Sequence, residues 1–342
     1  VELQSNESYR ALASQKNLLE NYLTRQRELE RKVEELNQAL ANIKRNINHL
    51  LQDDQEGIFA PYPSLLEKMN GNYEFSSAMN TLMELLQQKK NEYSMLEMKQ
   101  KIKKDELTNK IEENKKEIEQ LKNKKPIYPE HVITLQREIN HTLLQANKTS
   151  SAKILCELLE IKDSQWANAI EGYLNTQRFY LIVEEEDYDL ASSTYQRLKN
   201  KTGLYGVGLI NTQMLYQYDK VVKGTLAEEI TTSNIYARRF INMILGKVFK
   251  AESLQELKQH SISITKDGMR YQNHTLMAID PKIYAKPYIG AGALEIQLKM
   301  AISKGKELNA KLKELDENIK QLAQKIQWSD AKDIYTILNK LD

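Results

Sequence analysis

Residues 29–50 read LERKVEELNQALANIKRNINHL and repeat apolar side chains at alternating spacings of four and three. The repeat positions are Leu29, Val33, Leu36, Leu40, Ile43, Ile47 and Leu50. The same rhythm returns near the other end of the chain, at Leu294, Leu298, Ala301, Gly305, Leu308, Leu312, Leu315, Ile319, Leu322 and Ile326. Because a heptad seam needs a partner helix to cover it, the two segments predict an antiparallel coiled coil with an intervening domain that turns the chain around.

The composition favours long helices, since charged residues make up 28% of the 342 residues and there are only 12 Gly and 6 Pro. The formal charge is +2, so any DNA or acidic partner would bind a local patch. Cys156 is the only cysteine, which excludes an internal disulfide and favours a reduced, cytoplasmic setting with a buried thiol. The sequence has no long apolar run and no secretion signal, and we expect no membrane partner. The first residue is Val1 rather than Met, which favours a piece of a longer protein.

The chain divides into five predicted segments. These are a coiled-coil arm (1–50), a Gly- and Pro-containing break or elbow (51–75), outgoing helices with a Pro break at 125–129 (76–148), a globular domain (151–290), and a returning helix (292–342) with a phase slip between Ile326 and Ile334. The outgoing material is longer than the return helix. Residues 1–50 therefore pair either with a strand beyond Asp342 or with residues 76–124, and the sequence leaves both alternatives open.

The predicted domain at 151–290 belongs to the α+β class. A helical pattern at 166–174 followed by an apolar strand at 179–183 is echoed by a helix at 236–245 followed by Val248-Phe249. The echo predicts two related lobes, about 151–215 and 225–290. A further strand is expected at 206–210. Residues 261–265 and 269–278 predict a hairpin, because the Asp-Gly of Lys266-Asp267-Gly268 suits a tight turn.

Several short motifs resemble the hinge of the SMC (structural maintenance of chromosomes) ATPases over roughly residues 150–305. They are the apolar strand 155–159, the helix containing Ala169-Ile170-Glu171 and Leu174, the strand Leu181-Ile182-Val183, the strand Leu245-Gly246-Lys247-Val248-Phe249 and the turn Ile264-Thr265-Lys266-Asp267-Gly268. The resemblance implies an antiparallel coiled coil that carries a two-lobed dimerisation domain.

The stretch 279–290 departs from ordinary SMC hinges, whose Gly-rich signature is reduced here to Gly290-Ala291-Gly292. This stretch resembles the divergent MukB-like proteins, particularly the JetC-type ATPase subunit of Wadjet plasmid-defence complexes. The resemblance implies a homodimer, DNA loop extrusion by the whole complex, and kleisin-type and accessory subunits bound mostly elsewhere. The alternatives are a chromosome-maintenance condensin and a coiled-coil scaffold whose insert binds a protein partner. A small-molecule enzyme is the weakest reading.

Two sets of residues are candidates for binding. We expect Gly290 and Gly292, which permit close backbone approach, to form the dimer interface with Tyr284, Tyr288 and Ile289 as apolar anchors. DNA phosphates would be neutralised by clustered cations, although such clusters are often ordinary solvated surface. The candidates are Arg197, Lys199, Lys201, Lys220, Lys223, Arg238, Arg239, Lys247 and Lys250.

No catalytic, cofactor or metal site is predicted in this sequence. Gly246-Lys247 and Gly305-Lys306 lack the other residues of a phosphate-binding P-loop, so ATP and Mg²⁺ would bind the parent protein in head segments outside these residues. The five His have no metal-ligand spacing, and the acidic run 184–187 suits the start of a solvated helix.

Overall fold

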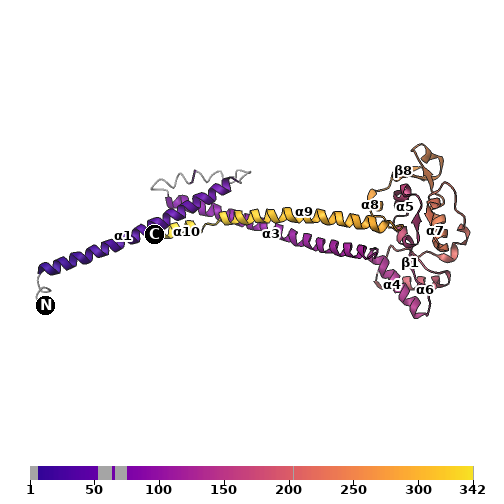
Figure 1. The fold of residues 1–342 in the computed structure, drawn as a ribbon, viewed down its shortest axis with the longest axis horizontal. Coiled ribbons are helices and arrows are strands. Elements are labelled where there is room, and N and C mark those ends of the chain that lie inside the picture. The colour runs from indigo at the N-terminus through magenta and orange to yellow at the C-terminus, as the bar shows by residue number, and fades with distance from the viewer. Residues whose placement is uncertain (1–6, 53–63, 66–74, 203, 342) are drawn as a thin grey trace. The chain divides into compact units, whose positions relative to one another are not determined.

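The computed structural model describes residues 7–52, 64–65, 75–202 and 204–341. They form two compact units. The arm unit comprises Val1–Lys110 with Leu308–Asp342, and the domain unit comprises Ile111–Glu307. Two long helices, α3 (Phe75–Lys122) and α9 (Ala293–Trp328), contribute to both units (Figure 1).

The arm unit is a helical bundle. Helix α1 (Glu7–Gln52) packs its second half against the start of α3 and against α10 (Lys332–Leu341). Ile47, Leu82 and Ile334 are fully buried at the centre of this core. The main partner of the second half of α1 is α10, which neither alternative left open for the first arm included, and the start of α3 contributes to the same apolar core.

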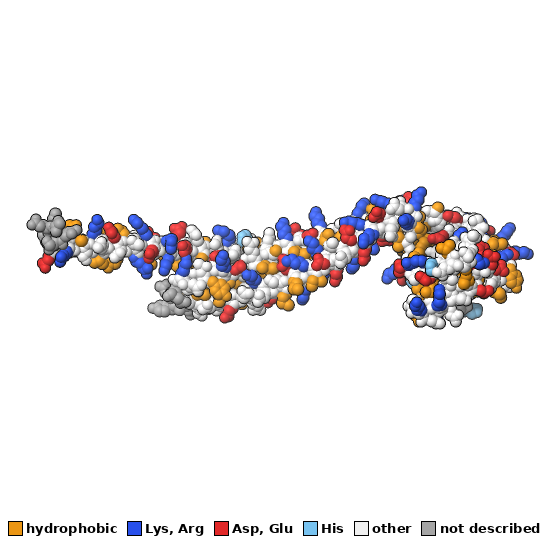
Figure 2. Space-filling model, turned by 90° about the horizontal axis from the view of Figure 1, so that it is seen from below, with side chains coloured by type: hydrophobic (Ala, Val, Ile, Leu, Met, Phe, Trp, Pro, Cys, Tyr) orange, Lys and Arg blue, Asp and Glu red, His pale blue; other side chains and the backbone are white. Residues whose placement is uncertain are grey.

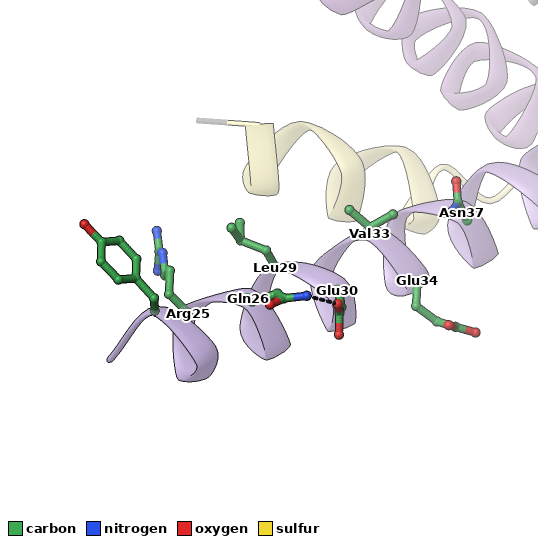
Figure 3. A pocket seen from close by; sticks show the side chains of 8 residues that line it. Arg25, Gln26, Leu29, Glu30, Val33, Glu34 and Asn37 are labelled. Carbon is green, nitrogen blue, oxygen red and sulfur yellow. Dashed lines mark hydrogen bonds between the residues drawn. The ribbon is translucent and has the colours of Figure 1, made fainter. Parts of the chain in front are cut away.

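The first half of α1 continues the same seam, and its apolar side chains are exposed. Leu12, Leu19, Tyr22, Leu29 and Val33 are all exposed. Leu29 and Val33 point to the same side of the helix, beside a shallow hollow whose lining also includes Gln26 and Glu30 (Figure 3). Within the described residues, the seam has a partner from Leu36 onward only.

The returning segment is two helices and not the single helix predicted for 292–342. Helix α9 ends at Trp328, and α10 begins at Lys332. Asp330 stops the helix between them, since its carboxylate accepts from Lys332 N at 2.9 Å and pairs with Lys90 Nζ at 3.0 Å. The predicted phase slip is thus a turn that directs Ile334 and Ile337 into the core. The predicted break at 51–75 lies mostly outside the described residues.

The domain unit contains short helices around one apolar core. They are α4 (Glu130–Gln145), α5 (Ala167–Leu174), α6 (Tyr188–Thr202), α7 (Ile235–Leu245) and α8 (Pro281–Tyr284). Helix α4 follows Pro129 as predicted and buries Val132, Leu135, Ile139 and Leu143. Ala146 is exposed because it is the residue at which the helix ends.

Three small sheets complete the domain unit. Strand β1 (Lys153–Ile154) pairs with β3 (Leu181–Ile182), and β2 (Glu160–Ile161) pairs with β4 (Ile230–Thr231), both antiparallel. The third sheet has the order β5 (Phe249–Ala251), β6 (Ile262–Thr265), β7 (Met269–Gln272) and β8 (Thr275–Ala278). In it β5 and β6 are parallel and the other pairs antiparallel.

The predicted fold class, an α+β domain between long antiparallel helices, is confirmed. The helix–strand echo is present as α5 with β3 and α7 with β5. One apolar core spans both predicted lobes, and the β2–β4 pair joins them.

Three strand predictions need correction. Residues 206–210 form a single bridge, from Leu209 to Leu181, because Gly206 has a positive φ of 84°. The apolar stretch 155–159 is mostly a 3-10 helix, Leu155–Leu158. Residues 269–278 contain two strands, since Asn273 and His274 both have positive φ and turn the chain back.

Helices α3 and α9 run antiparallel and side by side (Figure 1). In the arm unit, Lys104 Nζ pairs with Asp316 at 2.7 Å. In the domain unit, Asn114 is buried at the seam opposite Gly305, where an added Cβ would lie 2.6 Å from Asn114 Oδ1. The glycine at this heptad position therefore makes room for a buried amide, a side chain that can fix the register of a coiled coil.

Candidate functional site

The residues predicted for the dimer interface lie in one connection, which we call the return segment (residues 279–292, between β8 and α9). It begins with helix α8, where the Asp280 side chain accepts from Lys282 N at 2.9 Å as an N-cap. After α8 the chain has no regular secondary structure until Ala293. Contacts with the rest of the domain unit therefore determine its path.

A buried ion pair holds the return segment. Arg178 Nη1 donates to Glu171 Oε2 at 2.7 Å, and both side chains are almost completely buried. The other carboxylate oxygen of Glu171 accepts from Tyr288 N at 2.6 Å and from Ile289 N at 2.7 Å. Arg178 Nη2 donates to the Ile283 carbonyl at 2.8 Å. We call this set the latch: Glu171, Arg178, and the backbone groups of residues 283, 288 and 289.

Aromatic rings surround the guanidinium of the latch. The Arg178 Cζ lies 5.0 Å from the centre of the Phe179 ring and 4.9 Å from that of Tyr288, distances typical of cation–π contacts. The Phe179 and Tyr288 rings meet edge to face at 4.7 Å, and Tyr128 stacks on Tyr288 at 6.2 Å. Burial raises the pKa of the Tyr288 hydroxyl, so this ring remains neutral.

The two predicted interface glycines have different surroundings. Gly290 has a φ of 90°, and a Cβ there would lie 2.9 Å from Glu160 Oε2, whose carboxylate accepts from Ala291 N at 3.1 Å. Only glycine fits this conformation without strain. A Cβ at Gly292 would meet nothing within 4 Å. An intrachain turn thus explains the glycine at 290, and nothing around residue 292 requires one.

The predicted anchor side chains contact their own domain. Ile289 is 5% exposed in the core, and Tyr288 is half-buried over Arg178. Tyr284 is also half-buried, with its hydroxyl 3.5 Å from the Asp267 carbonyl. Their part in a dimer stays a prediction.

Strand β8 is an exposed sheet edge, and it forms the second half of the stretch 269–278 that was predicted as one continuous strand of a hairpin. It pairs with β7 alone among the described strands, and all four of its residues are exposed. Leu276 and Met277 are 49% and 51% exposed. The missed signal is the polar Asn273-His274 pair, which suits a two-residue hairpin turn with positive φ at both positions.

Three of the predicted DNA-binding cations are engaged within the chain. Arg238 donates to the carbonyls of Ala227, at 3.2 Å, and Ile230, and burial lowers its pKa. Arg239 Nε pairs with Asp219 at 2.6 Å. Lys250 pairs with Glu228 and Glu229; burial alone would lower its pKa, but hydrogen bonds to the two carboxylates raise it.

The other six candidate cations are exposed, and in the described part of the chain they form no ion pair. They are Arg197, Lys199, Lys201, Lys220, Lys223 and Lys247. Across the face shown in Figure 2, basic and acidic side chains are interspersed along the helices, so charge does not gather there on a single patch. DNA contact by these residues stays a prediction.

The acidic run 184–187 is partly structural. The side chain of Asp187 is buried, where it accepts from Ser150 Oγ and pairs with Lys148 Nζ at 2.9 Å. Burial alone would raise the pKa of Asp187, but the hydrogen bonds from Ser150 and Lys148 lower it. Among the residues that the structure describes, no three His, Cys, Asp or Glu side chains are grouped to hold a metal ion.

The single cysteine is buried, and burial raises the pKa of its thiol. It is therefore a poor nucleophile at neutral pH. No helix in the described ranges is long and apolar enough to cross a membrane.

No protein-family model matches the sequence, and no curated protein matches it. Solved structures that it resembles include the hinge domain of the Pyrococcus furiosus SMC protein, with 18% identity, a TM-score of 0.33, and coverage of 43% of this chain and 86% of that one. An asymmetric dimer of the Geobacillus stearothermophilus SMC hinge domain has 16% identity, a TM-score of 0.35, and coverage of 72% and 97%. The Pyrococcus furiosus Smc hinge domain with an extended coiled coil has 18% identity, a TM-score of 0.34, and coverage of 75% and 98%. At these scores, function must be inferred from this chain's own residues.

Proposed function

We propose that this chain is the hinge and adjoining coiled coil of an SMC-like ATPase, and that its domain unit joins two subunits into a homodimer. The observation that carries the proposal is the unpaired edge of β8. An exposed edge strand presents unpaired backbone donors and acceptors to another strand. Leu276 and Met277, on opposite faces of that strand, would supply apolar contacts.

Antiparallel α3 and α9 support a mechanical role for the domain. They bring the chain out and back beside each other, so the two arms of a subunit would move together. The proposed complex extrudes DNA loops and restricts plasmids in the manner of Wadjet systems. Its nucleotide and Mg²⁺ sites, and most contacts with kleisin-type and accessory subunits, would lie outside residues 1–342.

The dimer is tested by changing the edge strand. We expect the double variant Leu276→Lys/Met277→Lys to weaken self-association by about tenfold or more, because burying an ammonium at an apolar contact costs at least about 1.4 kcal/mol. The matched control is Leu254→Lys, which alters an exposed apolar residue away from β8. Sedimentation of the 342-residue chain measures both. Equal association by all three proteins would contradict the β8 interface.

A second activity, contact with DNA, is favoured by the exposed cations at the end of α6. We expect Lys199→Glu/Lys201→Glu to lower duplex affinity and to reduce the salt dependence, by about 0.9 in slope per lost phosphate contact. Lys258→Glu is the control, since that lysine is exposed and outside the candidate set. Fluorescence anisotropy over a salt series distinguishes the two. Unchanged affinity in the double variant would remove DNA from the proposal and favour a scaffold whose insert binds a protein.

Plasmid defence and chromosome maintenance use the same mechanical parts, and we propose the former. Deleting the parent gene should then raise the retention of a small plasmid without changing chromosome segregation. Defective segregation with unchanged plasmid retention would favour the condensin alternative.

A further inference from the structure

The latch brings together parts of the chain that are far apart in sequence. Glu171 and Arg178 lie on α5 and the turn that follows it, whereas the backbone groups that they bind lie more than 100 residues later. One carboxylate accepts from two successive amides, and the paired guanidinium binds the Ile283 carbonyl. The return segment is therefore held near both of its ends by a single buried ion pair.

In the return segment, Glu171 and Arg178 form their hydrogen bonds with backbone groups and not with side chains. Tyr288 N and Ile289 N donate to Glu171 whatever their side chains are, so the latch constrains the path of the chain. Two residues later Ala291 N donates to Glu160, and helix α9 begins at Ala293. The direction in which α9 leaves the domain thus depends on these two carboxylates.

Each of the two buried charges of the latch is stabilised mainly by the other. Glu171 has no exposed surface, and its partners are Arg178 and the two amides. Arg178 Nε is buried and has no hydrogen-bond partner among the described residues, so the guanidinium relies on the Glu171 carboxylate, the Glu171 and Ile283 carbonyls and two ring faces. Removing either charge leaves the other buried and unpaired, which is strongly unfavourable.

We propose that the Glu171–Arg178 latch couples the start of helix α9 to the first lobe. All of its hydrogen bonds to the return segment break together, which frees residues 283–289 while the rest of the domain stays folded. The latch is inferred from intrachain contacts alone and does not depend on dimerisation. In an SMC-like hinge it would transmit movement between the arm and the lobe.

Hydrogen exchange of the 342-residue chain tests the proposal at named amides. In Arg178→Met we expect the Tyr288 and Ile289 amides to exchange about a hundredfold faster, although Arg178 touches neither amide. Glu171→Gln should accelerate the same two amides. The amides of Ser263 and Ile264, in the centre of the third sheet, should remain protected in the variant, exchanging only by unfolding of the whole domain and at least about tenfold more slowly than those of Tyr288 and Ile289.

Glu160→Gln is the matched control, because Glu160 binds the same segment beyond the latch. It should accelerate Ala291 and leave Tyr288 unchanged. The milder variant Arg178→Lys keeps a positive charge at this position. It allows the same exchange measurement if Arg178→Met fails to fold.

Two outcomes overturn the proposal. One is wild-type exchange of Tyr288 and Ile289 in Arg178→Met, which would mean that the pair does not hold the segment. The other is equal protection of the sheet amides and of the Tyr288 and Ile289 amides in both Arg178 variants, which would mean that the segment opens only when the whole domain unfolds.

Discussion

The arm unit buries apolar side chains along helix seams, whereas the domain unit holds its return segment with a buried ion pair. The arm core consists of residues such as Ile47, Leu82 and Ile334, each supplied by a different helix. The latch instead joins Glu171 and Arg178 to three backbone groups. An apolar seam tolerates gradual change, while a buried charge cannot lose its partner without a large cost.

The chain offers one tryptophan in each unit to follow this difference. Trp166 is buried in the domain unit, and Trp328 stacks on His49 in the arm unit at 4.8 Å. Trp328→Phe leaves a reporter for the domain, and Trp166→Phe leaves one for the arms. Urea unfolding followed by fluorescence can then be measured for each unit.

The largest effect is expected at the latch. Arg178→Met should lower the free energy of unfolding of the domain unit by about 3 kcal/mol, near the lower end for a broken buried ion pair, because the freed segment lets water reach Glu171. The Trp166 transition should move to lower urea and the Trp328 transition should not. A loss below about 0.5 kcal/mol, the usual range for surface changes, would mean that the pair is not a stabilising contact.

Shortening one buried side chain of the arm core should lower the free energy of unfolding by a similar amount. Leu82→Ala should destabilise the arm unit by about 2–4 kcal/mol through a buried cavity, reported by Trp328. Met95→Ala, an exposed residue on the same helix, is the control and should change stability by less than about 0.5 kcal/mol. Equal effects of the two variants would contradict the proposed core.

The two glycines of the return segment provide a smaller and sharper comparison. Gly290→Ala should cost about 1–3 kcal/mol, because alanine is strained at a φ of 90° and would crowd Glu160. Gly292→Ala should cost less than about 0.5 kcal/mol. If the two variants unfold at the same urea concentration, the turn does not explain Gly290.

Acid should reveal the smallest effect, at Asp187. Its pKa is lowered in the folded chain, so its stabilising contribution is complete above the ordinary value near 3.8 and is lost as the pH falls through the lower folded value. Asp187→Asn should remove that part of the pH dependence of domain unfolding. Identical acid profiles for variant and wild type would show that Asp187 has no such role.

The long helices could be predicted from sequence because their repeat is local. The arm predicted at 1–50 contains α1 (Glu7–Gln52), and the outgoing helices predicted at 76–148 with a Pro break are α3 (Phe75–Lys122) and α4 (Glu130–Gln145). The phase slip after Ile326 was visible, but whether it bends or breaks a helix depends on Asp330 and its contact with Lys90. The predicted strand at 206–210 was wrong, because Gly206 adopts a positive φ and an alternation of apolar residues carries no information about φ.

The latch could not be predicted from spacing. Glu171 was noted only as part of a helical motif, and its amide partners lie 117 and 118 residues further on. A charged residue among the apolar residues of α5 was the available signal, since such residues are seldom buried unless they are paired. Gly290 was predicted for the dimer interface because glycine permits close backbone approach, and its observed close neighbour is Glu160 of the same chain.

The central claim, that the domain unit joins two subunits, is tested most directly by the solution mass of the 342-residue chain over a concentration series. The account predicts a mass that reaches twice the 39.8 kDa of one chain, and a return to one chain's mass in Leu276→Lys/Met277→Lys. A wild-type mass of 39.8 kDa at every concentration would contradict it.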